Sequence, residues 1–248
     1  MHIQAGRHKG RVLLGPPAGS TTRPITGLAK KSLFDTLADW MPEAVVADLY
    51  CGTGSMGLEA LSRGARRVAF GEMDRRVLDR LRRNVEALGV AASSIIWLGD
   101  VTRGLARRLD ELGEKLDLAF VDPPYADLRQ WDWPEAEAAL FAPLAAHLAP
   151  DGVVVLRMPD DAALPAGVGP AGGAEVDTAV EVLTLAGLTC RKVKRFGNMV
   201  LAIMGLEKRT AEQGTGNREP GKRNSGTGSR EPGKGNSGTG SHDFIGNA

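Results

Sequence analysis

The chain has 248 residues and is predicted to fold as an α/β protein with a doubly wound sheet. Between Pro42 and Leu206, short apolar runs alternate with amphipathic segments of helical periodicity. Since parallel strands need long crossover connections, this alternation favours a parallel sheet with helices on both faces. A glycine-rich turn directly follows the first apolar run. With 42% hydrophobic and 25% charged residues, the chain can also form a sizeable buried core.

The individual elements follow from the length and period of each apolar run. The helix expected at 75–88 is the clearest, because its apolar residues recur at core-facing spacing. Two apolar segments joined by a Phe-Gly-Asn turn, 188–195 and 199–204, predict a closing antiparallel hairpin. The expected strands are 44–49, 67–70, 94–98, 116–121 and 153–158, the other helices are 56–62, 101–112 and 135–148, and 163–174 is an expected Gly/Pro-rich loop.

The first 41 residues have a different character. The segments 2–4 and 11–14 flank a Gly-Arg-His-Lys-Gly turn, which predicts a small β-hairpin. A helix is expected at 28–40, and Pro42 marks its end. Six side chains in this region are basic and two are acidic. Such a basic arm commonly contacts phosphate, although a solvated surface explains the charge equally well.

The other end of the chain is a polar repeat. From Gly214, a twelve-residue unit of Gly, Ser, Pro, Asn and charged residues occurs twice. It has almost no apolar side chain to bury, so residues 207–248 are expected to be a disordered tail. The folded part should therefore end near Leu206.

Several functional classes are excluded by composition. The two cysteines, Cys51 and Cys190, cannot form a disulfide scaffold and suit a reducing compartment. No apolar run approaches the ~18 residues of a membrane span, and the basic start of the chain lacks the apolar core of a signal peptide. The four histidines are scattered without metal-ligand spacing. We therefore expect a cytoplasmic protein with no membrane or metal site.

The first motif with chemical meaning lies at the end of the first expected strand. Gly52, Gly54 and Gly57 match the G-x-G-x-x-G spacing, which lets the backbone approach a ligand in Rossmann-like folds. A tight structural turn would explain the same glycines. The acid ahead of them, Asp48, is unsuited to a pyrophosphate and suits a cationic or amine-bearing ligand, such as the sulfonium end of S-adenosylmethionine.

Two further acids end the next two expected strands. Glu72 can accept hydrogen bonds from both ribose hydroxyls, as acids do in dinucleotide-binding folds. Asp74 could do the same, but an Asp just before a helix is more often an N-cap. Asp100 is placed to accept from an adenine amino group, and the equally good alternative is a cap for a helix that begins at Val101.

A fourth motif, Asp122-Pro123-Pro124-Tyr125, follows the fourth expected strand and points to the reaction. The Asp122 side chain and the rigid Pro-Pro carbonyl can hold an exocyclic amine by its hydrogens, which leaves the nitrogen lone pair aimed at a methyl group. Tyr125 offers a ring that can stack on a base. Trp131 and Trp133, just beyond, either stack on RNA or pack in the core.

Taken together, these motifs resemble the S-adenosylmethionine-dependent amino-methyltransferases. More narrowly, the chain resembles the bacterial family that methylates N2 of a guanine in 16S ribosomal RNA. The resemblance covers about residues 1–206 and is carried by the glycine loop, the Asp-Pro-Pro-Tyr tetrapeptide and the segments 3–11, 23–26, 32–34, 57–65 and 72–74. The chain departs from the family pattern at 27–30, where Gly-Leu-Ala-Lys replaces an Asp-Arg pair and a second Arg.

The resemblance implies a role for each motif. The cofactor S-adenosylmethionine would be held by Asp48, Gly52, Gly54, Gly57, Glu72 and Asp100, the target base would meet Asp122, Pro123, Pro124 and Tyr125, and RNA would be bound by Arg7, Lys9, Arg11 and Arg23. Residues 1–41 would then be an RNA-binding hairpin and helix, and 42–206 the methyltransferase domain. The expected partner is 16S rRNA or the assembling small subunit, bound by a monomer.

Two other functions stay open on sequence grounds. The Asp-Pro-Pro-Tyr motif is shared with enzymes that methylate N6 of adenine or another nucleic-acid amine, so it does not distinguish the two purines. A non-catalytic RNA-binding assembly factor could keep the fold, but it would have no physical need for the intact tetrapeptide at 122–125.

Overall fold

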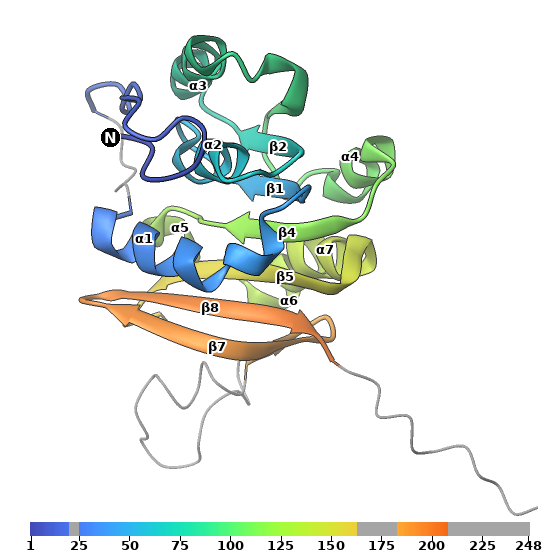
Figure 1. Cartoon of the computed structure of the whole chain (residues 1–248). Coiled ribbons are helices and arrows are strands. Elements are labelled where there is room, and N and C mark those ends of the chain that lie inside the picture. The colour runs from blue at the N-terminus through green and yellow to red at the C-terminus, as the bar shows by residue number, and fades with distance from the viewer. Residues whose placement is uncertain (20–24, 163–182, 208–248) are drawn as a thin grey trace, which may run out of the picture. The chain divides into compact units, whose positions relative to one another are not determined.

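The computed structural model describes residues 1–19, 25–162 and 183–207. Within these ranges, the strands form one mixed sheet in the order β3-β2-β1-β4-β5-β8-β7-β6 (Figure 1). β1 to β5 run parallel to their neighbours among themselves, whereas β8 is antiparallel to both β5 and β7. The strands are β1 Val45–Leu49, β2 Arg67–Glu72, β3 Ser94–Leu98, β4 Leu116–Val121, β5 Leu148–Pro159, β6 Thr184–Leu185, β7 Leu188–Phe196 and β8 Met199–Leu206.

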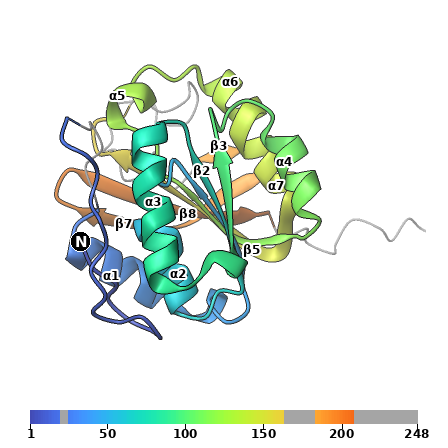
Figure 2. The ribbon, with the colours of Figure 1, turned by 90° about the horizontal axis from the view of Figure 1, so that it is seen from above.

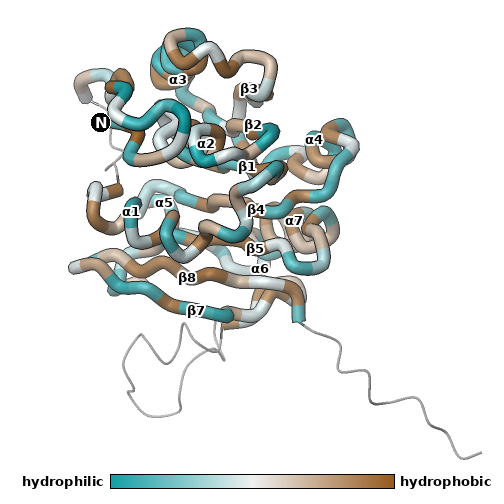
Figure 3. Tube along the Cα trace, in the orientation of Figure 1, coloured by the Kyte–Doolittle hydropathy of each residue, from teal (hydrophilic) through white to brown (hydrophobic). Residues whose placement is uncertain are grey.

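This arrangement confirms the predicted doubly wound sheet and its closing antiparallel hairpin. The chain order of the strands reverses between β1 and β4, which makes their shared carboxyl end a topological switch point, where open α/β sheets bind ligands. The antiparallel hairpin β7–β8 extends the sheet beyond β5. In Figure 3, β8 is hydrophobic along most of its length, whereas much of β7 is hydrophilic. Several β7 residues are exposed, while β8 is almost entirely buried.

Helices cover both faces of the sheet, as Figure 2 shows from above. The core on one side joins α1, α2 and α3 to the sheet, and the core on the other side joins α4, α6 and α7 to it. The α-helices are α1 Gly27–Thr36, α2 Ser55–Ser62, α3 Arg75–Leu88, α4 Leu105–Leu112, α5 Tyr125–Leu128, α6 Trp133–Ala136 and α7 Ala142–His147.

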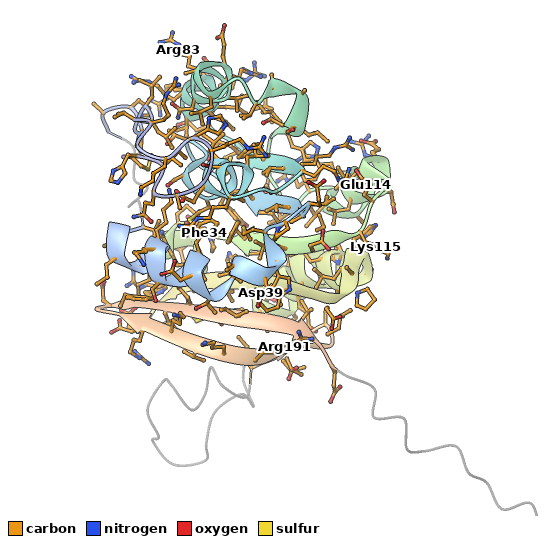
Figure 4. All side chains as sticks on the ribbon, viewed as in Figure 1. Phe34, Asp39, Arg83, Glu114, Lys115 and Arg191 are labelled. Atoms are coloured by element: carbon orange, nitrogen blue, oxygen red, sulfur yellow. The ribbon has the colours of Figure 1, made fainter. Side chains whose placement is uncertain are left out.

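Side-chain alternation along the strands divides the two cores. On β1, Val46 belongs to the first core, while Val45 and Ala47 belong to the second. Phe34 points from α1 toward the sheet (Figure 4), and its ring centroid lies 5.8 Å from that of Phe120 on β4. The first core therefore packs α1 directly against the strands that end at the switch point.

The first nineteen residues pack against α2 and α3. The predicted hairpin is reduced to a single antiparallel bridge between His2 and Val12. Ile3 and Leu13 are nonetheless fully part of the first core. Because the segment obtains most of its backbone partners from α2 and its own turns, it does not need two regular paired strands.

Two predicted helices differ in where they end or begin. The helix expected at 28–40 ends at Thr36 and continues as a 3₁₀ turn, Ala38–Trp40. The helix expected from Val101 begins only at Leu105, because Gly104 takes a left-handed conformation with φ +74° and caps it.

A third predicted helix, expected at 135–148, is interrupted. It consists of α6, a π-helical turn at Glu137–Phe141 and α7. Pro143 lies in the first turn of α7 and has no N–H to donate to the preceding turn, which accounts for the wider turn before it.

The strands also differ from the prediction in places. β5 begins at Leu148 rather than 153, because Leu148 pairs with Leu116 before a bulge shifts the register. The short strand β6 was not predicted. The loop expected at 163–174 lies outside the described residues, as does the tail beyond 207. Over the described ranges, no helix has the length and apolar character that a bilayer crossing requires.

Candidate active site

A cavity of about 800 Å³ opens at the switch point, where the carboxyl ends of β1, β2, β4 and β5 meet. The glycine-rich loop closes one side of it, and the segment that follows β4 closes the other. Predicted site residues on its wall are Asp48, Gly52, Glu72, Asp122, Pro123, Pro124 and Tyr125. The sequence motifs that were expected to act together are thus brought to one place.

Each glycine of the loop occupies its position for a different structural reason. Gly52 lines the cavity with φ +57°. Gly54 caps α2 in the left-handed region, and a Cβ there would lie 2.4 Å from the side chain of Leu81. Gly57 lets α2 pack closely on β2, since a Cβ would lie 2.4 Å from the Phe70 ring. Gly54 and Gly57 shape the loop and do not line the cavity.

Asp48, at the end of β1, presents a buried acceptor to the cavity. Its Oδ2 accepts from the Gly57 N–H at 2.8 Å, while its Oδ1 is buried without a hydrogen-bond partner among the described residues. Burial raises the pKa of Asp48 to about 7, and the nearby carboxylates of Asp122 and Glu72 add to the rise. A positively charged or amine-bearing ligand would supply the missing donor.

Glu72, at the end of β2, is held rigidly by backbone donors. One carboxylate oxygen accepts from Gly52 N–H at 3.0 Å, and the other accepts from Met73 and Asp74 N–H, each at 2.8 Å. Asp74 accepts from the Arg76 N–H at 2.8 Å, which confirms it as the N-cap of α3. Glu72 therefore keeps a fixed orientation, with acceptor capacity remaining on the oxygen that takes only the Gly52 donor.

Asp100 does not cap a helix, contrary to one of the two interpretations of the sequence. Its Oδ1 accepts from the backbone N–H and the hydroxyl of Thr102, at 2.9 and 2.7 Å, and α4 begins further on. Asp100 is absent from the wall of the large cavity. It lines a smaller hollow of about 60 Å³, whose wall it shares with Glu72, Tyr50 and Asp127.

The tetrapeptide after β4 carries a charge pair that sequence reasoning missed. Arg157 Nε lies 2.7 Å from Asp122 Oδ1, and the Arg157 guanidinium carbon lies 5.4 Å from the centre of the Tyr125 ring. Burial raises the pKa of Asp122 to about 6, against the opposing effect of Arg157. One cation therefore contacts both the polar and the aromatic member of the motif.

A signal for Arg157 was present in the sequence. It is the charged residue within the apolar run 153–158, and a buried charge in a strand interior is unusual unless it is paired. Tyr50 is a second residue that the sequence did not single out. It lines both hollows and has φ +60°, a conformation that non-glycine residues seldom adopt and that clusters at functional sites.

Of the predicted RNA-binding residues that the structure describes, none lies on the cavity wall. Arg7 and Lys9 are exposed, and Arg11 donates to the Ala87 carbonyl at the end of α3. Arg23 is not among the described residues. Other parts of the same segment, among them Pro16, reach the cavity wall, whereas Arg7 and Arg11 lie at the C-terminal ends of α2 and α3, away from the cavity.

Lys30, in the stretch that departs from the family pattern, is buried and paired. Its Nζ lies 2.9 Å from Glu59 Oε2, and Glu59 also accepts from Arg63 Nε at 2.9 Å. The backbone N–H groups of Gln4 and Ala5 donate to the same carboxylate at 2.8 and 3.0 Å. Glu59 thus joins the N-terminal segment, α1 and α2 at one buried point.

Two tryptophans and one cysteine close to the site have packing roles. Trp131 and Trp133 pack edge to face, 5.4 Å between centroids, and Trp131 also contacts Phe141 in the second core. Cys51 belongs to the buried core. Within the described part of the chain, no group of His, Cys, Asp and Glu is placed to hold a metal ion.

Comparison with known proteins places the chain in a family. The family model described as "Conserved hypothetical protein 95" matches residues 1–170. "Putative rRNA methyltransferase YlbH" of Bacillus subtilis (strain 168) is 32% identical over 128 residues, which are 51% of this chain and 68% of that protein. "Ribosomal RNA small subunit methyltransferase D" of Escherichia coli (strain K12) is 33% identical over 125 residues, 50% of this chain and 60% of that protein.

Solved structures extend the likeness beyond the segment aligned in sequence. "Putative methyltransferase yhhF" from Escherichia coli matches with a TM-score of 0.63 and 26% identity, over 84% of this chain and 98% of that one. A hypothetical protein from Thermus thermophilus matches with a TM-score of 0.62 and 25% identity, over 83% and 99%. These findings confirm the resemblance to the bacterial S-adenosylmethionine-dependent 16S rRNA methyltransferases, and the chain belongs to the conserved hypothetical protein 95 family.

Proposed function

We propose that the chain transfers a methyl group from S-adenosylmethionine to the exocyclic N2 amine of a guanine in 16S rRNA. The observation that carries the proposal is the cavity itself, whose wall contains both Asp48, a buried acceptor suited to an amine, and the tetrapeptide that begins at Asp122. The names of the related proteins, which refer to rRNA methylation and to the small ribosomal subunit, support the substrate class.

The residues at the switch point fit S-adenosylmethionine. The unpartnered Oδ1 of Asp48 suits the amine or sulfonium end, and the fixed carboxylate of Glu72 suits the ribose hydroxyls. The small hollow beside Asp100 suits the adenine amino group. When bound, the cofactor supplies an electrophilic methyl carbon on a positively charged sulfur.

The tetrapeptide would position the nucleophile. The Asp122 carboxylate would accept from the target amine, and Tyr125 would stack on a base that has left its helix. Because the amine is neutral and the methyl group is already activated, alignment of the two would supply most of the rate. Asp122 would then take the proton that the nitrogen loses as its new bond forms.

The exposed basic residues Arg7 and Lys9, with Arg11 and Arg23, would bind rRNA phosphates at a distance from the cavity. Phosphate binding of this kind releases counterions, so affinity for RNA would fall as the salt concentration rises. Residues 1–41 would in this way present the RNA to the 42–206 region.

The proposal is tested by methyl transfer from labelled S-adenosylmethionine to 16S RNA and to partly assembled small subunits. The product is digested to nucleosides and separated. We expect labelled N2-methylguanosine from the unchanged protein and none from Asp122→Ala. Asp110→Ala is the matched control, because Asp110 lies exposed on α4 and pairs with His147. Labelled N6-methyladenosine would contradict the assigned base, and no transfer to any RNA would contradict the reaction.

A further inference from the structure

The pairing of Arg157 with Asp122 bears on which base the cavity accepts. Arg157 rises from β5 and Asp122 follows β4, and these strands are parallel neighbours in the sheet. The side chains of the pair are 10% and 23% exposed, so both are largely removed from water. A charge pair this close to a substrate cavity is costly to desolvate, so its presence calls for a role.

The two purines present different edges to such a carboxylate. Beside its exocyclic amine, guanine carries a second donor, the N1–H, whereas adenine carries an acceptor, N1. An ionised carboxylate has only acceptor sites, about four lone pairs over two oxygens. It can accept from both guanine donors, but against adenine it would place an acceptor beside an acceptor. A protonated carboxyl group can instead donate to adenine N1.

We infer that Arg157 sets the base specificity of the site by holding Asp122 as an all-acceptor carboxylate that matches guanine and rejects adenine. Arg157 occupies Oδ1 from one side and lies against the Tyr125 ring, on which the base would stack. It is a positioning residue, because it acts through Asp122. The inference rests on the proposed function and adds the means by which guanine is selected.

The other charged groups around Asp122 do not replace Arg157. Among the described residues, those that line the two hollows are Asp48, Glu72, Asp74, Arg76, Asp100, Asp127 and Arg129. Arg129 pairs with Asp161 at 2.9 Å, and Arg76 pairs with Asp74 at 2.9 Å. Burial already raises the pKa of Asp122 to about 6, and Arg157 is the partner that opposes this rise. Without Arg157, Asp122 would be protonated nearer neutral pH.

The experiment compares two RNA fragments that differ at the methylated position, one with guanine and one with adenine. Arg157→Gln is predicted to lose activity on guanine about tenfold at pH 7, and to recover most of it at about pH 8.5, because loss of an adjacent cation raises a carboxyl pKa by ~2 units. Its activity on adenine relative to guanine should rise at pH 7. Arg157→Lys should retain the guanine preference, and Arg107→Gln, on exposed α4, should change nothing.

A second readout does not depend on turnover. In protein with ¹³C-labelled aspartate carboxyl groups, the NMR signal assigned to Asp122 by the Asp122→Asn variant should titrate at higher pH in Arg157→Gln. If Arg157→Gln does not fold, binding of the two RNA fragments to Asp122→Asn carries the test, because its amide can donate to adenine N1 and binding needs no proton transfer. Asp122→Asn should then bind the guanine fragment with a smaller preference over the adenine fragment than the unchanged protein does.

The outcomes separate the two proposals. If the unchanged protein does not form N2-methylguanosine, the proposed function fails. If it does, and Arg157→Gln keeps both the pH profile and the base preference of the unchanged protein, the assignment of Arg157 fails alone. An Asp122 signal that titrates at the same pH with and without Arg157 would overturn that assignment in the same way.

Discussion

The neighbouring lysines of α1 give a direct test of how the N-terminal segment is held. Lys30 is buried against Glu59, with side-chain exposures of 4% and 0%, whereas Lys31 is 66% exposed and pairs with Asp35. Lys30→Met removes one partner of a buried pair, a change that costs about 3 kcal/mol. Glu59 keeps Arg63 and two backbone donors, which limits the loss.

The assay is thermal unfolding of the two single variants side by side. For a chain of this size, a loss of about 3 kcal/mol corresponds to a fall in Tm of about 6–12 °C. Lys31→Met is expected to leave the Tm unchanged, because water screens its exposed pair. Glu59→Leu should lose more than Lys30→Met, since it removes the partner of Lys30, of Arg63 and of the Gln4 and Ala5 backbone N–H groups together. Equal Tm values for Lys30→Met and Lys31→Met would refute this account of the buried pair.

Three more predictions concern an acid in the cavity, a glycine of the glycine-rich loop and the basic residues of the N-terminal segment. Because the pKa of Asp48 is raised by folding, the free energy of unfolding should fall as pH rises from about 4 to 7. Asp48→Asn should remove much of that fall, which is measured by thermal unfolding at several pH values. Gly57→Ala should destabilise by about 1–3 kcal/mol through its contact with Phe70, measured by denaturant unfolding. Arg7→Gln and Lys9→Gln should each lower the slope of log K for RNA against log salt by about 1, measured by filter binding.

Each of these has a matched control or a contrary result. Gly15→Ala meets no atom within 4 Å and should leave stability unchanged, so an equal loss there would remove the packing argument for Gly57. Arg107→Gln removes an exposed charge on α4 and should keep the salt slope of the unchanged protein. A pH dependence of unfolding that Asp48→Asn leaves untouched would show that Asp48 titrates alike in the folded and unfolded states.

Much of the fold could be predicted because local pattern and global topology agree. Strand runs such as 116–121 are buried on both faces, and α3 has a single clear apolar stripe, so their periods are unambiguous. The acids at strand ends could be placed near one another because parallel strands end at the same edge of the sheet. The positions of Asp48, Glu72 and Asp122 at those ends were therefore enough to predict that the three share a site.

The differences arise where a single residue overrides the local pattern. Gly104 and Pro143 decide where α4 begins and where the π-helical turn lies, and neither effect is set by apolar periodicity. The pair of Arg157 with Asp122 was missed because it joins two strands that are distant in the chain. Which charges meet across a sheet depends on strand order and register, which composition and spacing do not determine.

The central claim is that the cavity between Asp48 and Asp122 methylates N2 of a guanine. Its most direct test is the identity of the labelled nucleoside released from 16S RNA after reaction with S-adenosylmethionine. The account predicts N2-methylguanosine from the unchanged protein, lost in Asp122→Ala and retained in Asp110→Ala. A different methylated nucleoside, or N2-methylguanosine that persists in Asp122→Ala, would contradict it.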